Sequence, residues 1–161
     1  MKKHRIRPTA LILRDRHVLL IEYEENGEQH YNLPGGGLKK GETLIEGLVR
    51  ELREEANVQA EVGPIAFIYE FHPLHQSGDY SPDERPSLHI VFACTLPEEQ
   101  VPELPLNPDP MQVGVRWVPL HELGSLVLYP NIADYILKFA DNPTVLPLIE
   151  DKYLQSYERR S

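Results

Sequence analysis

The sequence predicts an α+β fold in which helices pack on a mixed β-sheet. Two observations support this prediction. Runs with the composition of strands outnumber helical runs, and the first helical run stands inside the series of strands rather than after it. The 161 residues contain no internal repeat, low-complexity stretch or linker, so we expect a single domain over residues 1–161.

Turn residues separate the predicted elements. "RDR" between two apolar runs indicates a hairpin, and Asn26-Gly27 indicates a second turn. The predicted strands cover residues 9–14, 17–23, a short run ending at 31–33, and then, on either side of a Gly-Pro break, 58–62 and 65–71, followed by 88–96 and 113–119. Helices are predicted over 43–56 and 131–141. A tail follows from about 142 to 161, in which "TVLPLI" is compatible with an edge strand.

The chain is acidic: 16 Lys and Arg against 25 Asp and Glu give a formal net charge of −9. We therefore expect neither nucleic acid nor an anionic membrane as a partner. A phosphorylated small molecule remains a suitable partner, because a local cation or a metal can capture it. No apolar run reaches membrane-spanning length, and the single cysteine, Cys94, allows no intrachain disulfide. The expected location is the cytoplasm.

Three acids lie close together in the first predicted helix. Thr43 and Glu46 have the spacing of a capping box, which marks the start of the helix. Glu51, Glu54 and Glu55 then follow at i, i+3 and i+4 and share one face, on the flank of the apolar stripe. An exposed charged face is the commoner explanation of such a cluster. Partly buried carboxylates require a cation, however, and hard ions such as Mg²⁺ or Mn²⁺ bind these oxygens.

A glycine-rich segment, "LPGGGLKKGE", directly precedes this helix, and the two together form a long pattern. From Gly36 the order is five residues, Glu42, seven residues and then "RELREEANV", residues 50–58. This order resembles the Nudix box, G-x5-E-x7-R-E-U-x-E-E-x-G-U with U apolar, over residues 36–58. It departs from the box only at Asn57, where the family has glycine. Because asparagine tolerates the left-handed conformation that ends helices, we expect a positive φ at Asn57.

The resemblance implies the Nudix fold, an α/β/α sandwich with helices flanking a mixed β-sheet. It also implies a hydrolase that cleaves a nucleoside diphosphate linked to another moiety with the help of a divalent cation, Mg²⁺ or Mn²⁺. The implied metal ligands are Glu51, Glu54 and Glu55, with a carbonyl oxygen of Gly35 or Gly36 as a further ligand. Many members of the family pair, so the resemblance allows a homodimer.

Catalytic roles follow from the same resemblance. Arg50 would pair with Glu42 and brace the glycine loop against the helix; the alternative is an ordinary surface ion pair that contributes little. Either Glu54 or Glu55 would accept the proton of the attacking water. Some family members use an acid from a later loop instead. Here Asp109 is the nearest acid to that position, and we expect a base on the helix.

Residues that contact the substrate are less clearly marked. Tyr31, just before the glycine loop, is placed either to stack on a base or ribose or to pack in a half-buried strand. Tyr69 and Pro73 lie downstream of the box, where family members tend to place residues that select the substrate. Pro73 follows Val58 by fifteen residues, a spacing that resembles the ADP-ribose-hydrolysing subgroup. His89, inside a strand, is expected to be structural.

Three other interpretations remain open. A non-catalytic Nudix module that senses a nucleotide or regulates transcription would bind without metal-dependent turnover, and the intact acids argue against it. An RNA-processing Nudix enzyme would need a basic groove, which the acidic composition does not favour. An acid-rich structural helix in an unrelated α+β protein would show no stabilisation by metal.

Overall fold

The computed structural model describes residues 2–75 and 81–146 of the chain. The elements in these two ranges are β1 (Arg5–Arg14), β2 (His17–Glu25), β3 (Glu28–Asn32), α1 (Leu44–Ala56), β4 (Glu61–Phe71), β5 (Ser87–Thr95), β6 (Gln112–Pro119), the 3₁₀ helix η1 (Leu120–Ser125) and α2 (Ala133–Asp141). None of the helices in this part of the chain is long and apolar enough to span a membrane.

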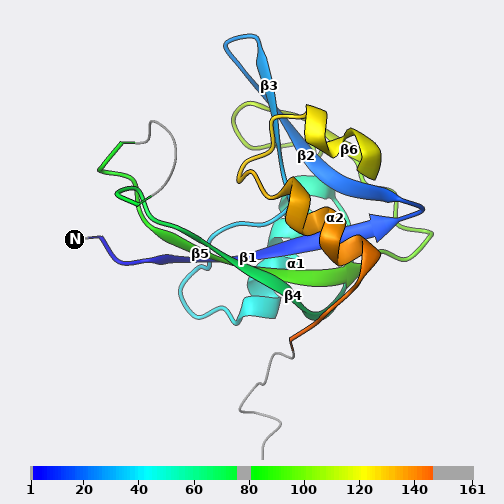
Figure 1. Ribbon diagram of the computed structural model, residues 1–161, viewed down its shortest axis with the longest axis horizontal. Coiled ribbons are helices and arrows are strands. Elements are labelled where there is room, and N and C mark those ends of the chain that lie inside the picture. Colours follow the sequence, from blue (N-terminus) through cyan, green and yellow to red (C-terminus); the bar gives the residue numbers. More distant parts are fainter. Residues whose placement is uncertain (1, 76–80, 147–161) are drawn as a thin grey trace, which may run out of the picture.

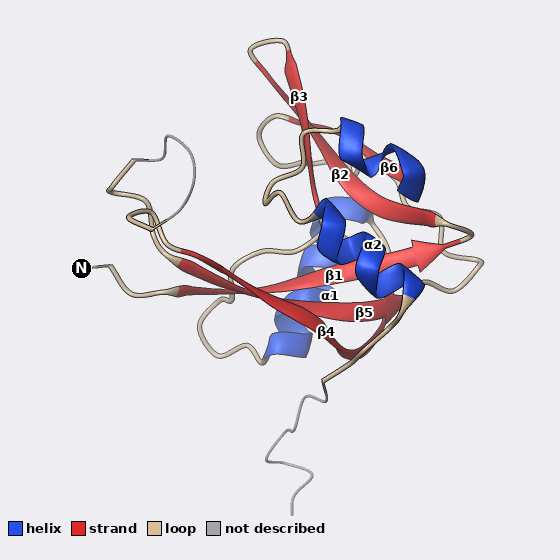
Figure 2. Cartoon of the chain, viewed as in Figure 1, coloured by secondary structure: helices blue, strands red, loops and turns tan. Residues whose placement is uncertain are grey.

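The strands form one mixed sheet in the order β3-β2-β1-β5-β4, with β6 also paired to β2. β1 and β5 run parallel, and the other neighbours run antiparallel. The helix α1 covers one face of the sheet, whereas α2 and η1 lie on the other (Figure 1, Figure 2). The predicted fold, a mixed sheet flanked by helices, is therefore confirmed.

The sheet divides where β1 and β2 meet. The two strands pair next to their turn, residues 13–14 with 17–18. Asp15 and Arg16 form this turn, and both have the positive φ that a two-residue hairpin of this kind requires. Beyond the turn, β1 continues beside β5, whereas β2 continues beside β3 and β6 (Figure 1). The two halves of the sheet diverge as a result.

Each face of the sheet has its own apolar core, because successive side chains of a strand point to opposite faces. Ile12 of β1 packs with Leu48 and Leu52 of α1 on one face. Leu11, the preceding residue, packs with Ile136 of α2 on the other. All five side chains are almost completely buried, and burial of each contributes about 1.5–3 kcal/mol. The helices are held to opposite faces by this alternation.

Both ends of α1 agree with the sequence prediction. The hydroxyl of Thr43 accepts the N–H of Glu46 at 3.2 Å, and the N–H of Thr43 donates to the carboxylate of Glu46 at 2.8 Å, which confirms the capping box. At the other end Asn57 has φ 54° and ψ 38°, and its N–H donates to the carbonyl oxygen of Arg53. The predicted left-handed Asn57 is confirmed.

The region after α1 differs from the prediction. Two strands were expected, over 58–62 and 65–71, but the structure has one, β4, which begins at Glu61. Shifts in its register with β5 near Gly63 accommodate the Gly-Pro break. A side chain at Gly63 would collide with the carbonyl oxygen of Ala93, so glycine allows the strands to pair closely here.

The last helix and the described part of the tail that follows it contain less regular secondary structure than the sequence predicts. The helix α2 begins at Ala133, two residues later than predicted. In the tail, Leu146 forms an isolated bridge with Ile65, at the place where an edge strand was considered. The remainder of the predicted tail, 147–161, lies outside the described residues.

We expect Asn57→Ala to lower the free energy of unfolding by about 1 kcal/mol relative to Asn57→Gly, because alanine is strained in the left-handed conformation and glycine is not. Both variants lose the hydrogen bond from Asn57 to Glu103, so their difference reports the backbone alone. Urea unfolding followed by circular dichroism measures this difference. Equal stabilities would contradict the prediction.

Candidate active site

Arg50 of α1 gathers the acids of the helix and the glycine loop around one cation. Its Nη1 lies 2.8 Å from Oε1 of Glu51 and 3.0 Å from Oε2 of Glu54. The same guanidinium contacts both carboxylate oxygens of Glu42, with Nε–Oε1 at 2.5 Å and Nη2–Oε2 at 3.0 Å. Its Nη2 also donates to the carbonyl oxygen of Gly37 at 3.2 Å. The expected Arg50–Glu42 pair is therefore present, and it is bidentate and largely buried rather than a loose surface contact.

Glu42 and Arg50 shift each other's pKa. Hydrogen bonds from Arg50, with a further one from the backbone of Lys39, lower the pKa of Glu42 from 4.5 to about 2. The pKa of Arg50 is raised, chiefly by its hydrogen bonds with Glu42. Both groups are therefore charged across the range in which the protein would work.

Glu55 points into the protein rather than toward Arg50. Its side chain is 5% exposed, and its Oε2 accepts the N–H of Gly35 at 2.9 Å. Burial raises the pKa of Glu55 from 4.5 to about 8, and the charges of Glu51 and Asp109 add to this effect. Gln112 of β6 fixes the helix at this point, since its Nε2 donates to the carbonyl oxygen of Glu55 at 2.7 Å. At neutral pH the Glu55 carboxyl is mainly protonated in the ligand-free protein.

The glycine loop lies between these acids and β1, to whose edge it is hydrogen-bonded. A side chain at Gly36 would collide with the carboxylate of Glu51. A side chain at Gly37 would collide with the guanidinium of Arg5. A side chain at either position would have to displace the carboxylate of Glu51 or the guanidinium of Arg5, so glycine allows both groups to pack directly against the loop backbone.

The acids form a donor set that suits a hard divalent cation. Within residues 2–75 and 81–146, no three His, Cys, Asp or Glu side chains stand in a ready chelating arrangement. Glu51 and Glu54 turn to Arg50 instead, and Glu55 turns to Gly35. The oxygens of Glu51 and Glu54 nevertheless converge within 3.0 Å of one positive nitrogen, Nη1 of Arg50. Carboxylate oxygens beside backbone carbonyls are the ligands that Mg²⁺ and Mn²⁺ prefer.

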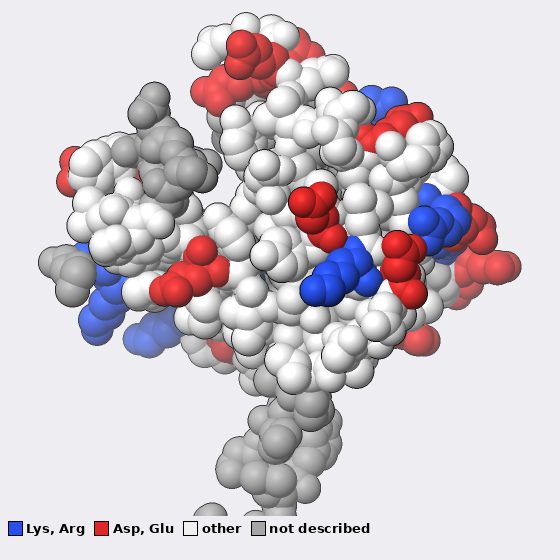
Figure 3. Space-filling view, viewed as in Figure 1, with Lys and Arg blue, Asp and Glu red and all other residues white. Residues whose placement is uncertain are grey.

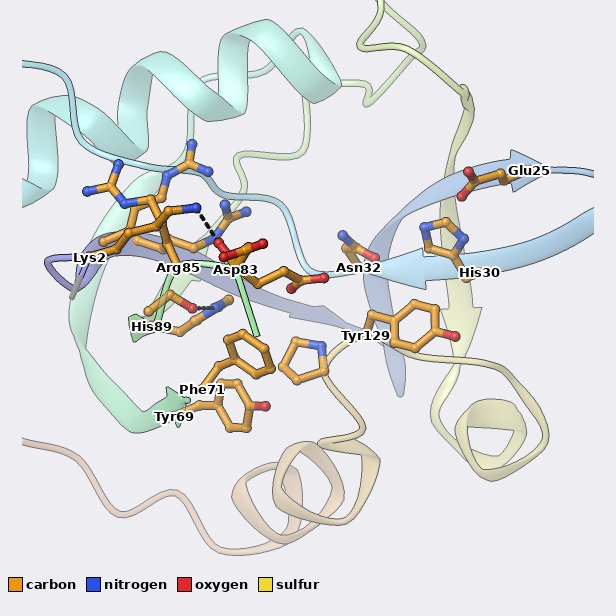
Figure 4. Close-up of a pocket in the computed structure, with 15 residues that line it drawn as sticks. Lys2, Glu25, His30, Asn32, Tyr69, Phe71, Asp83, Arg85, His89 and Tyr129 are labelled. Carbon is orange, nitrogen blue, oxygen red and sulfur yellow. Dashed lines mark hydrogen bonds between the residues drawn. The ribbon is translucent and has the colours of Figure 1, made fainter. Parts of the chain in front are cut away.

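A cavity of about 900 Å³ opens beside the glycine loop, where the two halves of the sheet diverge. The registers of β1, β5 and β4 place two rows of side chains along it: Arg7, His89 and Tyr69, and Arg5, Ser87 and Phe71. Across the cavity lie His30, Asn32 and Tyr129 (Figure 4), and Pro130 also lines it. Figure 3 shows this hollow beside the β2–β3 hairpin. The acids of α1 do not line it.

Positive charge in this cavity comes from Lys2, Arg5, Arg7 and Arg85. Burial lowers the pKa of Arg7, and the neighbouring charge of Arg5 adds to this effect. Burial also lowers the pKa of His89 to about 4, so its imidazole is neutral at physiological pH. The Nε2 of His89 lies 3.1 Å from the hydroxyl of Ser87, and its ring packs edge-on against Tyr69 with centroids 5.2 Å apart. The cavity therefore combines the guanidinium groups of Arg5, Arg7 and Arg85 with the neutral ring of His89.

The family model described as the NUDIX domain matches residues 3–139. The chain belongs to the Nudix family. It is 35% identical to Phosphatase NudJ of Escherichia coli strain K12 over 121 residues, which cover 73% of this chain and 71% of that protein. These similarities show that the chain is a Nudix hydrolase.

Solved structures agree with this fold. A NUDIX hydrolase from Nitrosomonas europaea superimposes with a TM-score of 0.71 and 19% identity, covering 96% of this chain and 98% of that one. A MutT protein from Methanosarcina mazei Go1 gives a TM-score of 0.65 and 24% identity, covering 89% and 98%. At such identities the likeness concerns the fold alone.

The three residues that the sequence suggests for substrate contact, Tyr31, Tyr69 and Pro73, lie in different surroundings from one another. Tyr69 lines the cavity. Tyr31 is 5% exposed in the core, where its hydroxyl accepts a hydrogen bond from Arg116, so the structure favours the packing alternative for this residue. Pro73 lies in the turn after β4 and is not among the residues that line the cavity.

The sequence predicts little of this cavity. His89, which is expected to be structural, lies in the cavity wall together with Arg5, Arg7 and Asn32. The signal that was available is the spacing of Arg5 and Arg7, two residues apart in a strand and therefore on one face. The pairing of β1 with β5 decides which face of the sheet the two arginines occupy and which strands lie beside them.

The ion pair between Glu42 and Arg50 makes a contribution to stability that depends on pH. Because its pKa is lower in the folded protein than in the unfolded chain, the pair stabilises the protein above about pH 4.5, and this contribution is lost as the pH falls toward about 2. We expect Glu42→Gln to lower the melting temperature at about pH 7, with a gap to the wild type that narrows on acidification. Circular dichroism melting between about pH 7 and pH 2.5 measures this gap.

The matched control is Glu28→Gln, which changes an exposed acid of the β2–β3 hairpin. The melting temperature of this control should stay close to that of the wild type at every pH. A gap for Glu42→Gln that stayed constant across the acidic range would contradict the assignment of the pair.

Proposed function

We propose that this Nudix hydrolase is a divalent-metal-dependent pyrophosphohydrolase that cleaves a nucleoside diphosphate linked to another moiety. ADP-ribose-like compounds, dinucleoside polyphosphates and nucleotide sugars are the substrate groups in question. The observation that supports this proposal is the glycine loop, which packs against Glu51 through Gly36 and against Arg5 through Gly37. One short loop thus joins the acids of α1 to a cavity lined by Arg5, Arg7 and Arg85.

The proposed ligands of Mg²⁺ or Mn²⁺ are Glu51, Glu54 and Glu55, together with a carbonyl oxygen of Gly35 or Gly36. A divalent cation bound there would neutralise phosphate charge and lower the pKa of an attacking water. Arg50 would keep Glu42 and the glycine loop in place. In the proposed arrangement Arg50 positions groups that act on the substrate and is not itself a reacting group.

The remaining steps fall to side chains of the chain itself. Water attacks phosphorus, and the phosphoanhydride P–O bond breaks as the leaving phosphate departs. Glu54, which is about half exposed, or Glu55, which is buried, takes the proton of the water. Arg5 and Arg7 are placed to bind phosphate oxygens, since both guanidinium groups lie in the cavity wall.

The proposed partner is a phosphorylated small molecule, in the cytoplasm, with neither nucleic acid nor membrane involved. A homodimer, which the family allows, remains a prediction that sedimentation velocity would test. The runner-up is a non-catalytic module that senses a nucleotide. It shares the fold and the cavity but predicts binding without metal-dependent turnover.

A substrate panel tests the proposed reaction. ADP-ribose, dinucleoside polyphosphates, nucleotide sugars, NADH, coenzyme A and nucleoside triphosphates are each incubated with Mg²⁺ or Mn²⁺, and the released phosphates are identified. We expect turnover with at least one compound that carries an internal pyrophosphate, and release of a nucleoside monophosphate. Glu54→Gln should reduce kcat by about 100-fold or more, because it removes both a charge and a proton acceptor at nearly constant shape.

Glu61→Gln, at an exposed acid of β4, is the control and should retain wild-type kcat. Wild-type, metal-dependent turnover by Glu54→Gln would exclude the proposed role of Glu54. If no compound in the panel is cleaved while nucleotides still bind, the non-catalytic module is the better description.

Glu55 makes a second prediction, about metal binding. Its pKa of about 8 in the metal-free protein means that the carboxyl holds a proton at about pH 7, and a cation that uses this oxygen must expel it. We expect Mn²⁺ binding to release close to one proton at about pH 7 and to strengthen as the pH rises toward about 8. Calorimetric titration in buffers of different ionisation enthalpy measures this release. Glu55→Gln should abolish it, and a wild-type protein that released no proton would contradict Glu55 as a ligand.

A further inference from the structure

The segment between β5 and β6 closes around the C-terminal end of α1. The N–H of Glu103 donates to the carbonyl oxygen of Ala56 at 3.1 Å, and the side-chain oxygen of Gln100 accepts the N–H of Gln59 at 3.0 Å. The last carbonyl groups of a helix have no partner within the helix, so contacts of this kind replace the missing bonds. Residues 97–112 are called the collar below, because they hold the end of α1 from outside the helix.

Gln112 is the buried residue of the collar. Its side chain is 5% exposed, as is that of Glu55. Its Nε2 donates to the carbonyl oxygen of Glu55 at 2.7 Å, and its Oε1 accepts the N–H of Asp109 at 3.4 Å. Both ends of the amide are therefore used. A single side chain joins the last turn of α1 to the turn that contains Asp109.

An irregularity in β6 places Gln112 against the helix. Val115 packs on the α1 side of the sheet, so regular alternation would place Val113 on that side as well. The register with β2 shifts at this point, however, and Tyr23 pairs with Gln112 instead of Val113. Val113 is 44% exposed, whereas Gln112 is buried. A β-bulge re-aims side chains in this way, and bulges are common next to active sites.

The residue before Gln112 has a costly backbone conformation. Met111 has a φ of 68°, in the left-handed region that residues with a side chain rarely adopt. Its carbonyl oxygen accepts the N–H of Glu24 at 2.9 Å, and the N–H of Gln112 donates to the carbonyl oxygen of Asp109 at 3.0 Å. These bonds keep the turn in its strained shape. Strain of this kind is concentrated at functional sites, where the surrounding structure maintains it.

The carbonyl oxygen of Glu55 depends on Gln112 for its hydrogen bond. In a continuing α-helix it would accept the N–H four residues later, but the N–H of Gln59 donates to Gln100 instead. A buried carbonyl group without a partner costs free energy, so loss of the Gln112 amide would favour unwinding of the last turn. Unwinding would separate Glu55 from Glu51, one turn earlier in α1.

We propose that Gln112 is a positioning residue for the metal site, which holds the backbone of Glu55 so that the carboxylates of Glu51 and Glu55 face the same cation. The inference rests on the proposed function, since it takes Glu55 as a ligand of Mg²⁺ or Mn²⁺. Gln112 itself contacts neither the cation nor the substrate in this assignment. Loss of a partner that orients a metal ligand typically weakens metal binding about 10- to 100-fold.

Gln112→Met tests this role, because it keeps the length of the side chain and removes both hydrogen-bonding groups. Mn²⁺ binding is measured by calorimetric titration of the metal-free protein, without substrate. We expect Gln112→Met to raise the Kd for Mn²⁺ about tenfold or more. Since all the proposed ligands remain, saturating Mn²⁺ should restore most of the wild-type kcat, which a general loss of structure would not allow.

Gln100→Met is the matched control. It removes another glutamine of the collar, whose partner Gln59 follows the helix and is not a proposed ligand. Both variants should lower the melting temperature of the metal-free protein, but only Gln112→Met should weaken Mn²⁺ binding. Gln112→Asn keeps an amide that is one methylene too short to reach Glu55. It should behave as Gln112→Met does, and it decides the question if that variant does not fold.

The outcomes distinguish this inference from the proposed function. An unchanged Kd for Mn²⁺ in the Gln112 variants would overturn the inference, and so would an equal weakening by Gln100→Met. If the wild type binds no Mn²⁺, the inference and the metal-dependent reaction are both wrong. A Kd that rises only in the Gln112 variants, in a protein that cleaves no compound of the substrate panel, would support the inference and overturn the hydrolase proposal. Mn²⁺-dependent cleavage with an unchanged Kd in these variants would do the reverse.

Discussion

The guanidinium of Arg50 is the group on which the rest of the site depends. Two carboxylates about 5 Å apart repel by roughly 3 kcal/mol at an effective dielectric constant near 20, so the acids of α1 cannot lie together beside a packed loop without a cation among them. Arg50 supplies this charge to Glu51 and Glu54 and holds Glu42 and the carbonyl oxygen of Gly37 at the same time. The loop therefore cannot move without disturbing the acids, and the acids cannot rearrange without releasing the loop.

Because of this coupling, the glycine loop separates the acids of α1 on one side from Arg5 and the large cavity on the other. On one side the loop backbone meets carboxylates: Gly35 donates to Glu55, and Gly36 packs against Glu51. On the other side Gly37 packs against Arg5, at the edge of the large cavity. A side chain at Gly36 would displace the carboxylate of Glu51, and one at Gly37 would displace the guanidinium of Arg5. The absence of side chains therefore lets the loop backbone pack closely against an acid on one side and an arginine on the other.

The parts of the structure that the sequence predicted are those fixed by local spacing. The capping box at Thr43, the left-handed Asn57 and the shared face of the acids need only residues within a turn or two of one another. The cavity could not be predicted in this way, because Arg7, His89 and Tyr69 lie in three strands that only the sheet register brings together. Neighbours in sequence can have different surroundings: Tyr31 enters the core, which is one of the two alternatives predicted for it, whereas the next residue, Asn32, lines the cavity. The alternation of a strand is predictable, but its phase relative to the two faces is set by tertiary packing.

The overall charge of the chain can also be understood from this arrangement. A net charge of −9 does not favour a long basic track, yet Lys2, Arg5, Arg7 and Arg85 all reach one cavity. Asp83 and Glu84 stand at the same cavity and confine the positive field to a small region. Acidic side chains also mark the tip of the β2–β3 hairpin (Figure 3). A positive region of this size, bordered by negative charge, suits the compact pyrophosphate of the proposed substrates better than an extended polyanion, because repulsion from the surrounding acids grows with every phosphate that lies outside the cavity.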